Sequence, residues 1–180
     1  MRAATTRTKI ERLMAGLGRA VQSPGRVYFT GGVCAVLLGW RETTLDVDLK
    51  ADPEPNGFFE ALPQLKDAMD INIELASPDN FIPTLPGWRE RSSRIAAHGQ
   101  VEFYHYDFYS QALSKIERSH ERDHTDVASM LATGLVKRER LLELFWEIEP
   151  RLIRFPAVDA DALRKRVDAI ARGSQLICPP

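Results

Sequence analysis

Apolar residues recur at three- and four-residue steps between Thr8 and Val21, and this period predicts an amphipathic helix. Helical spacing or composition predicts six further helices, over residues 32–38, 56–69, 108–118, 121–133, 137–148 and 159–172. The last four follow one another without an intervening strand. The chain after residue 107 is therefore expected to be helical throughout.

Other segments alternate apolar and polar residues, which is typical of strands with one buried face. In residues 45–49 the alternation places Asp46 and Asp48 on one face and three apolar residues, beginning with Leu45, on the other. Strands are predicted over residues 26–30, 45–49, 71–75, 94–98 and 101–106, and three prolines make 77–87 a loop. This order predicts an α+β fold, with a mixed sheet and flanking helices over residues 1–107 and a C-terminal helical bundle over 108–180 packed on that core.

Composition excludes some classes of protein and is neutral toward others. Hydrophobic residues make up 44% of the 180 positions, and no apolar run approaches the roughly 20 residues that cross a bilayer. No membrane partner and a cytoplasmic location are therefore expected. The two cysteines, Cys34 and Cys178, provide neither a disulfide framework nor a metal-binding set.

The net charge of −1 conceals a strong asymmetry along the chain. Residues 1–41 carry seven Lys or Arg and one Glu, whereas residues 42–110 carry five basic and thirteen acidic residues. This pattern fits an acidic cation-binding site beside a surface that accepts phosphates. It fits equally well a chain whose unlike segments neutralise one another on folding.

Two features close together in the sequence point to nucleotide chemistry. Asp46 and Asp48 on one strand face lie ~7 Å apart at their α-carbons, so both carboxylates can reach one divalent cation. Mg²⁺ prefers such oxygen ligands and is commonly shared with the phosphates of a nucleotide. Gly31 and Gly32 lie between a predicted strand and helix, where the absence of a Cβ lets backbone amides approach a phosphate.

Each feature alone is weak, because an alternating Leu-Asp-Val-Asp-Leu is usually an edge strand with a solvated face. Together, with a short helix between them, they resemble the signature of the nucleotidyltransferase superfamily: G-[GS], a helix, then D-x-D. A longer pattern over about residues 25–130 resembles the AbiEii-type minimal nucleotidyltransferases, which include the MenT toxins. The matching segments are YFTGG at 28–32, LGWR at 38–41, LDVDL at 45–49, INIELA at 71–76, QALSKIER at 111–118 and RDHTDV at 122–127.

The resemblance implies a polymerase-beta-like nucleotidyltransferase fold and an enzyme that uses an NTP with Mg²⁺ or Mn²⁺. Characterised members transfer a nucleotide to the 3′ acceptor end of tRNA, which blocks translation, and a cognate antitoxin protein neutralises them. The expected partners are therefore NTP, tRNA or another RNA acceptor, and an antitoxin.

Carried over residue by residue, the resemblance makes Gly31 and Gly32 the phosphate loop and Asp46 and Asp48 the metal-binding pair. Gly32 departs from the pattern, because many superfamily members have Ser there and so provide a hydroxyl to the phosphate. A third carboxylate often completes such sites. Glu74, on the polar face of its strand, is the candidate for a metal ligand or general base, with a solvent-facing Glu as the alternative.

The same resemblance assigns Lys115 a contact to the triphosphate and Asp123 the role of the downstream acid. Asp126 lies three residues further along the same helix face, so the choice between the two acids stays open. Arg118 can add a phosphate contact or pair with a neighbouring carboxylate.

Two further groups have plausible binding roles. Arg89, Arg91 and Arg94 are candidate RNA or antitoxin contacts, although a solvated loop is the simpler interpretation. The aromatic residues of segment 103–109 can stack a base, although core packing is favoured.

Three functions remain open from the sequence. The leading one is a toxin that modifies tRNA. A second keeps the enzyme but transfers AMP to a protein, and a third is a non-catalytic member that binds a partner through its basic N-terminal helix.

Overall fold

The computed structural model describes residues 4–173, and contacts divide the chain into two compact units. The sheet unit contains the described residues up to Ser77 together with Ser92–Tyr106. The helical unit contains Pro78–Arg91 and the described residues from Asp107 onward. A boundary near residue 107 was expected, and the division by contacts additionally assigns the segment 78–91 to the helices.

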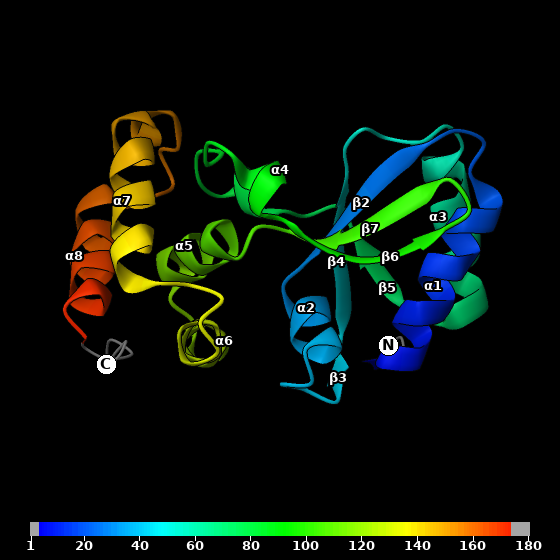
Figure 1. Ribbon diagram of the computed structural model, residues 1–180, viewed down its shortest axis with the longest axis horizontal. Coiled ribbons are helices and arrows are strands. Elements are labelled where there is room, and N and C mark those ends of the chain that lie inside the picture. Colours follow the sequence, from blue (N-terminus) through cyan, green and yellow to red (C-terminus); the bar gives the residue numbers. More distant parts are fainter. Residues whose placement is uncertain (1–3, 174–180) are drawn as a thin grey trace. The chain divides into compact units, whose positions relative to one another are not determined.

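A mixed five-stranded sheet forms the centre of the sheet unit (Figure 1). In spatial order its strands are β5 (Asn72–Glu74), β4 (Asp46–Ala51), β2 (Gly25–Thr30), β7 (Val101–His105) and β6 (Ser93–His98). β2 runs antiparallel to β4 and parallel to β7, β4 is parallel to β5, and β6 is antiparallel to β7. The predicted α+β class with a mixed sheet and flanking helices is confirmed.

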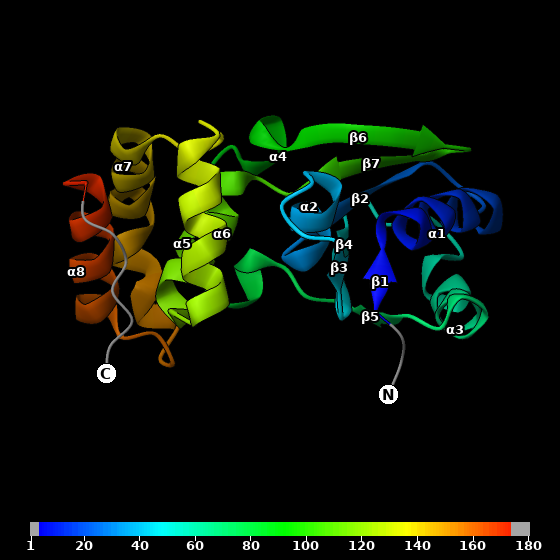
Figure 2. The ribbon, with the colours of Figure 1, turned by 90° about the horizontal axis from the view of Figure 1, so that it is seen from below.

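The two faces of this sheet differ in chemistry. The apolar face carries fully buried residues of the three central strands, among them Val27, Phe29, Val47, Leu49 and Phe103. Two helices pack there and lie side by side in Figures 1 and 2: α1 (Arg7–Ala20) and α3 (Phe58–Met69). The alternate positions of the same strands form the polar face, which includes both aspartates of β4.

Three short elements complete the sheet unit. Helix α2 (Gly32–Leu37) follows β2 directly, and a two-stranded pairing joins β1 (Thr5–Thr6) to β3 (Thr43–Thr44). The sequence did not predict β1 or β3, because two residues are too few to show a period.

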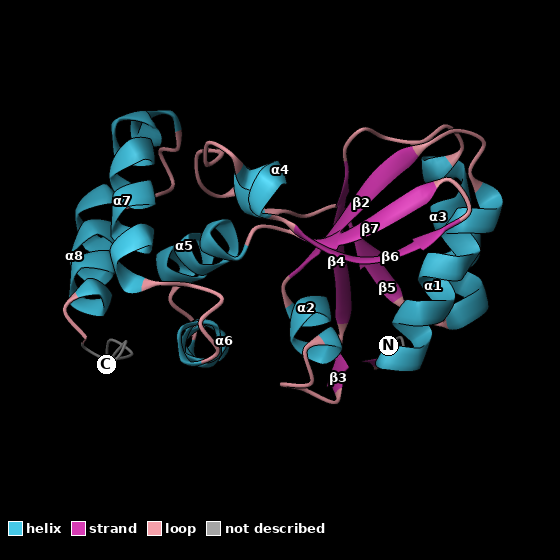
Figure 3. Cartoon of the chain, viewed as in Figure 1, coloured by secondary structure: helices cyan, strands magenta, loops and turns pink. Residues whose placement is uncertain are grey.

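The helical unit contains the predicted C-terminal helices (Figure 3). They are α5 (Phe108–Arg118), α6 (Glu121–Ala132), α7 (Arg138–Ile148) and α8 (Ala160–Ala171), each within two residues of the expected bounds. A 3₁₀ segment, η2 (Glu149–Arg154), follows α7. The expected loop at 77–87 contains a single 3₁₀ turn, η1 (Pro78–Asn80), and is followed by a helical turn that was not predicted, α4 (Trp88–Arg91).

An ion pair to a fully buried carboxylate connects segment 78–91 to the start of α5. The guanidinium of Arg91 donates two hydrogen bonds to the carboxylate of Asp107, at 3.0 and 2.8 Å. Asp107 is fully buried and also caps α5, because it accepts from the backbone N–H groups of Tyr109 and Ser110. Arg91, expected as a candidate RNA or antitoxin contact, therefore has a structural role.

Two apolar positions expected on the buried side of strands are exposed. Leu45 precedes β4, which begins at Asp46, and Leu75 follows β5, which ends at Glu74. β4 begins one residue later and β5 ends one residue earlier than the alternation predicts, so the prediction for these two residues is wrong. Separately, none of the helices within residues 4–173 combines the length and apolar composition needed to cross a membrane.

Candidate active site

The candidate active site begins at the first residues of β4. Asp46 and Asp48 are both half-buried on the polar face, while Val47 and Leu49 are fully buried on the apolar one. The burial of these two anchors fixes the register of β4, since a slip by one residue would turn the aspartates into the core. The strand thus presents two carboxylates side by side.

The neighbouring strand β5 supports these carboxylates. In the parallel register Asn72 lies beside Asp46 and Glu74 lies beside Asp48. The Asn72 side-chain amide donates to Asp46 Oδ1 at 2.8 Å and to Glu74 Oε1 at 3.0 Å. Asn72 therefore orients one aspartate and holds Glu74 in place. The sequence analysis did not single out Asn72, although its polar position two residues before Glu74 was a usable signal.

The glycine pair packs directly against this acidic strand. Gly31 has φ +62°, a backbone conformation that favours glycine, and a Cβ there would lie 2.7 Å from Asp48 Oδ2. The turn after β2 and the Asp48 carboxylate therefore approach closely because residue 31 has no side chain.

Gly32 is restricted by a different neighbour. A Cβ at residue 32 would collide with the hydroxyl of Thr44, which donates a hydrogen bond to the backbone carbonyl of Asp46 at 3.1 Å. The Thr44 hydroxyl thus occupies the space that a serine at position 32 would need. Thr44 was not anticipated from the sequence, because it lies twelve residues from the motif that it complements.

These residues fit a divalent cation held by two carboxylates. Mg²⁺ is commonly bound by one or two carboxylates, with the phosphates of a substrate completing its coordination. Across residues 4–173, no three His, Cys, Asp or Glu side chains gather closely enough to hold a metal ion. Asp46 and Asp48 stay the predicted donor pair, and the role of Glu74 as ligand or base likewise stays a prediction.

A second cluster, within the helical unit, joins α5 to α6. The ammonium group of Lys115 lies 3.0 Å from Asp123 Oδ1 and 2.7 Å from Asp126 Oδ2, and Arg118 lies 3.0 Å from the same Asp123 oxygen. Lys115, Asp123 and Asp126 are only 5, 5 and 3% exposed. Both acids contact the lysine, so these contacts do not distinguish Asp123 from Asp126 as the downstream acid.

The predicted site residues thus form two groups, each inside one unit. The first group, in the sheet unit, contains Gly31, Gly32, Asp46, Asp48 and Glu74. The second, in the helical unit, contains Lys115, Arg118 and Asp123, to which the structure adds Asp126. Within its own unit each group is held by defined hydrogen bonds or ion pairs.

A family match covers both groups. Residues 20–168 match a family described as "Nucleotidyltransferase of unknown function (DUF6036)". The chain belongs to this nucleotidyltransferase family. The matched residues run from the end of α1 into α8 and so include both residue groups. Searches of curated proteins and of solved structures found no match.

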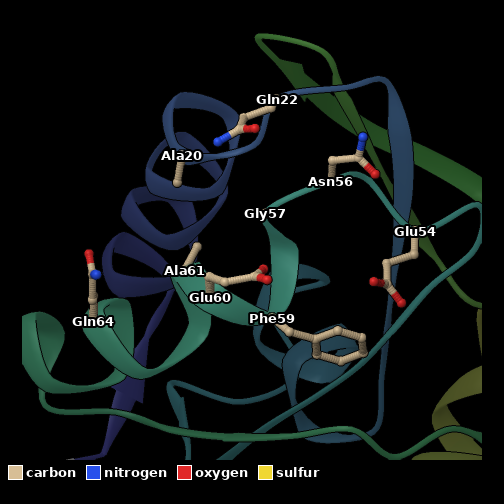
Figure 4. Close-up of a pocket in the computed structure, with 9 residues that line it drawn as sticks. All are labelled: Ala20, Gln22, Glu54, Asn56, Gly57, Phe59, Glu60, Ala61 and Gln64. Atoms are coloured by element: carbon tan, nitrogen blue, oxygen red, sulfur yellow. The ribbon is translucent and has the colours of Figure 1, made fainter.

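Two hollows in this nucleotidyltransferase lie away from the predicted residues. A cleft of about 620 Å³ adjoins the chain beyond the end of β4 and contains Glu54, Asn56, Phe59 and Glu60 in its lining (Figure 4). A second, of about 690 Å³, is bordered by α6 and the start of α7 in the helical unit. Neither contains a residue of the two groups.

One buried histidine of the sheet unit has a shifted protonation equilibrium. Burial lowers the pKa of His105, at the end of β7, to about 4. The imidazole is therefore neutral at physiological pH, and His105 belongs to the packed core.

Proposed function

We propose that this nucleotidyltransferase transfers a nucleoside monophosphate from an NTP to the 3′ acceptor end of tRNA. The observation that carries the proposal is the acidic pair, Asp46 and Asp48, on the polar face of β4 with the Gly31–Gly32 turn packed against it. A glycine turn that closely approaches a carboxylate pair brings phosphate-binding backbone and metal-binding oxygens to one place.

The reaction forms one bond and breaks another. The acceptor hydroxyl oxygen bonds to the α-phosphorus of the NTP, and the bond from that phosphorus to the β-phosphate bridging oxygen breaks to release pyrophosphate. The hydroxyl proton passes to a carboxylate, for which Glu74 is the candidate. A bound Mg²⁺ or Mn²⁺ screens the charge on the phosphates, and Asp46 and Asp48 would hold it.

The hydrogen bonds around the acidic pair support this chemistry. Asn72 orients Asp46, and the Thr44 hydroxyl holds the chain just before the pair through the Asp46 carbonyl. Because these hydrogen bonds already hold the carboxylates in place, little free energy has to be spent on reorganising the site during the reaction. For the helical unit, the AbiEii resemblance implies a triphosphate contact for Lys115 and the role of the downstream acid for Asp123, and Arg118 is a candidate for a further phosphate contact.

The biological role rests on the same resemblance. In this proposal the enzyme is the toxin of a toxin–antitoxin system, acts in the cytoplasm, blocks translation by modifying tRNA and is neutralised by an antitoxin protein. The segments that carry the resemblance include β2, β4, β5 and the α5–α6 cluster.

A transfer experiment tests the proposal. The purified protein is incubated with total tRNA, a bacterial protein extract and each α-³²P-labelled NTP in turn, with and without Mg²⁺. The proposal predicts label in tRNA with one or more NTPs, only in the presence of metal, and none with Asp46→Asn. Label in protein alone would instead identify a protein-modifying transferase, and no label in either would favour a non-catalytic member.

A further inference from the structure

The polar face of the sheet unit continues beyond the acidic pair as a basic and aromatic surface. In register, Thr30 lies opposite Asp48, Tyr28 lies opposite Lys50, and Tyr28 also lies beside Tyr104 of β7. Direct partners on adjacent strands share a face, and residues two apart along one strand do so as well. The acidic pair and the two tyrosines therefore lie on one continuous face.

Two arginines flank the outer tyrosine. Arg26 lies beside Glu102 on β2 and β7, and Arg94 lies opposite Tyr104 on β6. The Arg26 guanidinium sits 5.9 Å from the Tyr104 ring centroid. This part of the face carries Arg26, Lys50 and Arg94 together with the acids Glu102 and Asp52, so it has a small excess of positive charge. The end that carries Asp46, Asp48 and Glu74 is acidic. A bound RNA strand would match this charge distribution if its phosphates lay at the basic end and its reacting terminus lay at the acidic end.

The Tyr104 ring is held in place before any ligand arrives. It stacks on the buried Tyr28 ring at 5.3 Å between centroids, and its hydroxyl donates to Glu102 at 3.0 Å. Tyr104 is itself half-buried, and burial together with this hydrogen bond raises its pKa, so the phenol stays neutral at physiological pH. A neutral, immobilised ring stacks a base at a low entropic cost.

The arginines can exchange their partners for phosphates. Arg26 and Arg94 each lie 3.4 Å from the one Glu102 carboxylate, and the three side chains are 47, 56 and 39% exposed. Exposed pairs of this kind contribute little stability. Exchanging the shared carboxylate for a phosphate backbone therefore costs the two guanidinium groups little, and Arg26 additionally interacts with the Tyr28 side chain.

From these observations we propose that the single-stranded 3′ end of the RNA acceptor lies across this face. One base stacks on Tyr104, Arg26 and Arg94 bind the phosphates beside it, and the terminal hydroxyl reaches the acidic pair. Tyr104 is two strands and two residues away from Asp48, which is ~12 Å at the usual sheet spacings and is spanned by a few nucleotides. The inference rests on the proposed RNA-directed function and names the surface that function uses.

Fluorescence anisotropy with a fluorescein-labelled, single-stranded 12-nucleotide RNA ending in CCA, without NTP, tests the surface. Tyr104→Leu should weaken binding about 5- to 150-fold, the loss expected for one stacked base, and Tyr104→Phe should stay close to the wild type. The exposed double variant Arg26→Gln with Arg94→Gln should reduce the slope of log affinity against log salt by about 1.4, because two phosphate contacts are lost.

The outcomes separate this inference from the proposed function. Asp46→Asn should bind the RNA like the wild type but fail to transfer a nucleotide, since it removes a metal ligand and leaves the surface around Tyr104 unchanged. If the wild-type protein labels tRNA, and both Tyr104→Leu and the arginine double variant bind the RNA as tightly as the wild type, the proposed RNA surface is wrong and the proposed function is unaffected. A wild-type protein that does not bind the RNA also overturns the proposed surface, and is the result expected if the face serves a protein partner.

Discussion

Replacing Lys115 by Met tests the α5–α6 cluster that the sequence linked to the triphosphate. In the structure the Lys115 ammonium neutralises Asp123 and Asp126, and all three side chains are almost fully buried. The substitution keeps most of the side-chain length and apolar stem but removes the charge. Two buried carboxylates are then left with Arg118 as the cation already bonded to Asp123.

The expected loss of stability follows from the burial. Removing one partner of a buried ion pair destabilises a protein by about 3–5 kcal/mol, because the remaining charge stays away from water. Lys115→Met should fall in this range. Asp126→Asn should cost less, about 1–3 kcal/mol, since Lys115 keeps its contact with Asp123.

The double variant provides a matched control. Lys115→Met with Asp126→Asn removes one cation and one anion, so the cluster returns to a balanced pair of Arg118 and Asp123. Its loss of stability should be smaller than the sum of the two single losses, by about 0.5–3 kcal/mol.

Urea unfolding followed by tryptophan fluorescence measures these losses. Trp88 and Trp146 belong to the helical unit and Trp40 to the sheet unit, so two of the three chromophores lie in the unit that is perturbed. A Lys115→Met variant within about 0.5 kcal/mol of the wild type would refute the reasoning, because ordinary surface substitutions fall in that interval. Additive single losses would show that the lysine and Asp126 do not interact.

Three further predictions concern other parts of the chain. Gly31→Ala should abolish transfer in the tRNA labelling assay, because the added Cβ would press on Asp48. Gly39 has a similar φ and open space around it, so Gly39→Ala should lose only about 1–2 kcal/mol of stability and stay active. His105 should make the protein less stable in acid: its folded pKa of about 4 lies below the ordinary 6.5, so stability is complete above pH 6.5 and falls toward pH 4. The wild type should lose about 2 kcal/mol more than His105→Gln between pH 7 and 5 in urea titrations, and equal losses would show that this histidine does not titrate as described. Asp107→Ala should cost about 3 kcal/mol in thermal unfolding, because the ion pair with the half-buried Arg91 and the cap of α5 are lost together. Asp107→Asn should cost less, and equal costs would contradict the role assigned to the charge.

Most of the fold could be predicted because its elements carry strong periodic patterns. Helices such as α1 and α5 have an apolar stripe, and in β4 the buried Val47 and Leu49 alternate with the two polar aspartates. The patterns failed at Leu45 and Leu75, where the alternation runs one residue beyond the hydrogen-bonded strand. Alternation reports side-chain polarity and not where pairing ends, so strand ends are the first features to be missed.

The site was predictable where its residues lie close in the sequence. Gly31, Gly32, Asp46 and Asp48 span eighteen positions, and a single resemblance could therefore find them together. Asn72 entered only with the structure, because its role depends on the register between β4 and β5. Register is a property of strand pairing that the alternation of one strand does not contain.

The roles of basic residues were harder to predict than those of acids. Arg91 and Arg94 belong to one short basic segment, yet the first pairs with the buried Asp107 and the second lies on the polar face of the sheet, 56% exposed. Likewise, the resemblance predicted a triphosphate contact for Lys115, and the structure buries the lysine between two carboxylates. Partners that lie far away along the chain decide whether an arginine or lysine is structural.

The central claim is that Asp46 and Asp48 form the metal and nucleotide site of this nucleotidyltransferase. Isothermal titration of each NTP into the protein, with and without Mg²⁺, tests it without reference to any acceptor. The account predicts metal-dependent binding that Asp46→Asn and Asp48→Asn abolish and that Glu60→Gln, at an exposed acid on α3, leaves unchanged. Metal-dependent binding of equal strength in both aspartate variants, or no binding by the wild type to any NTP, would contradict it.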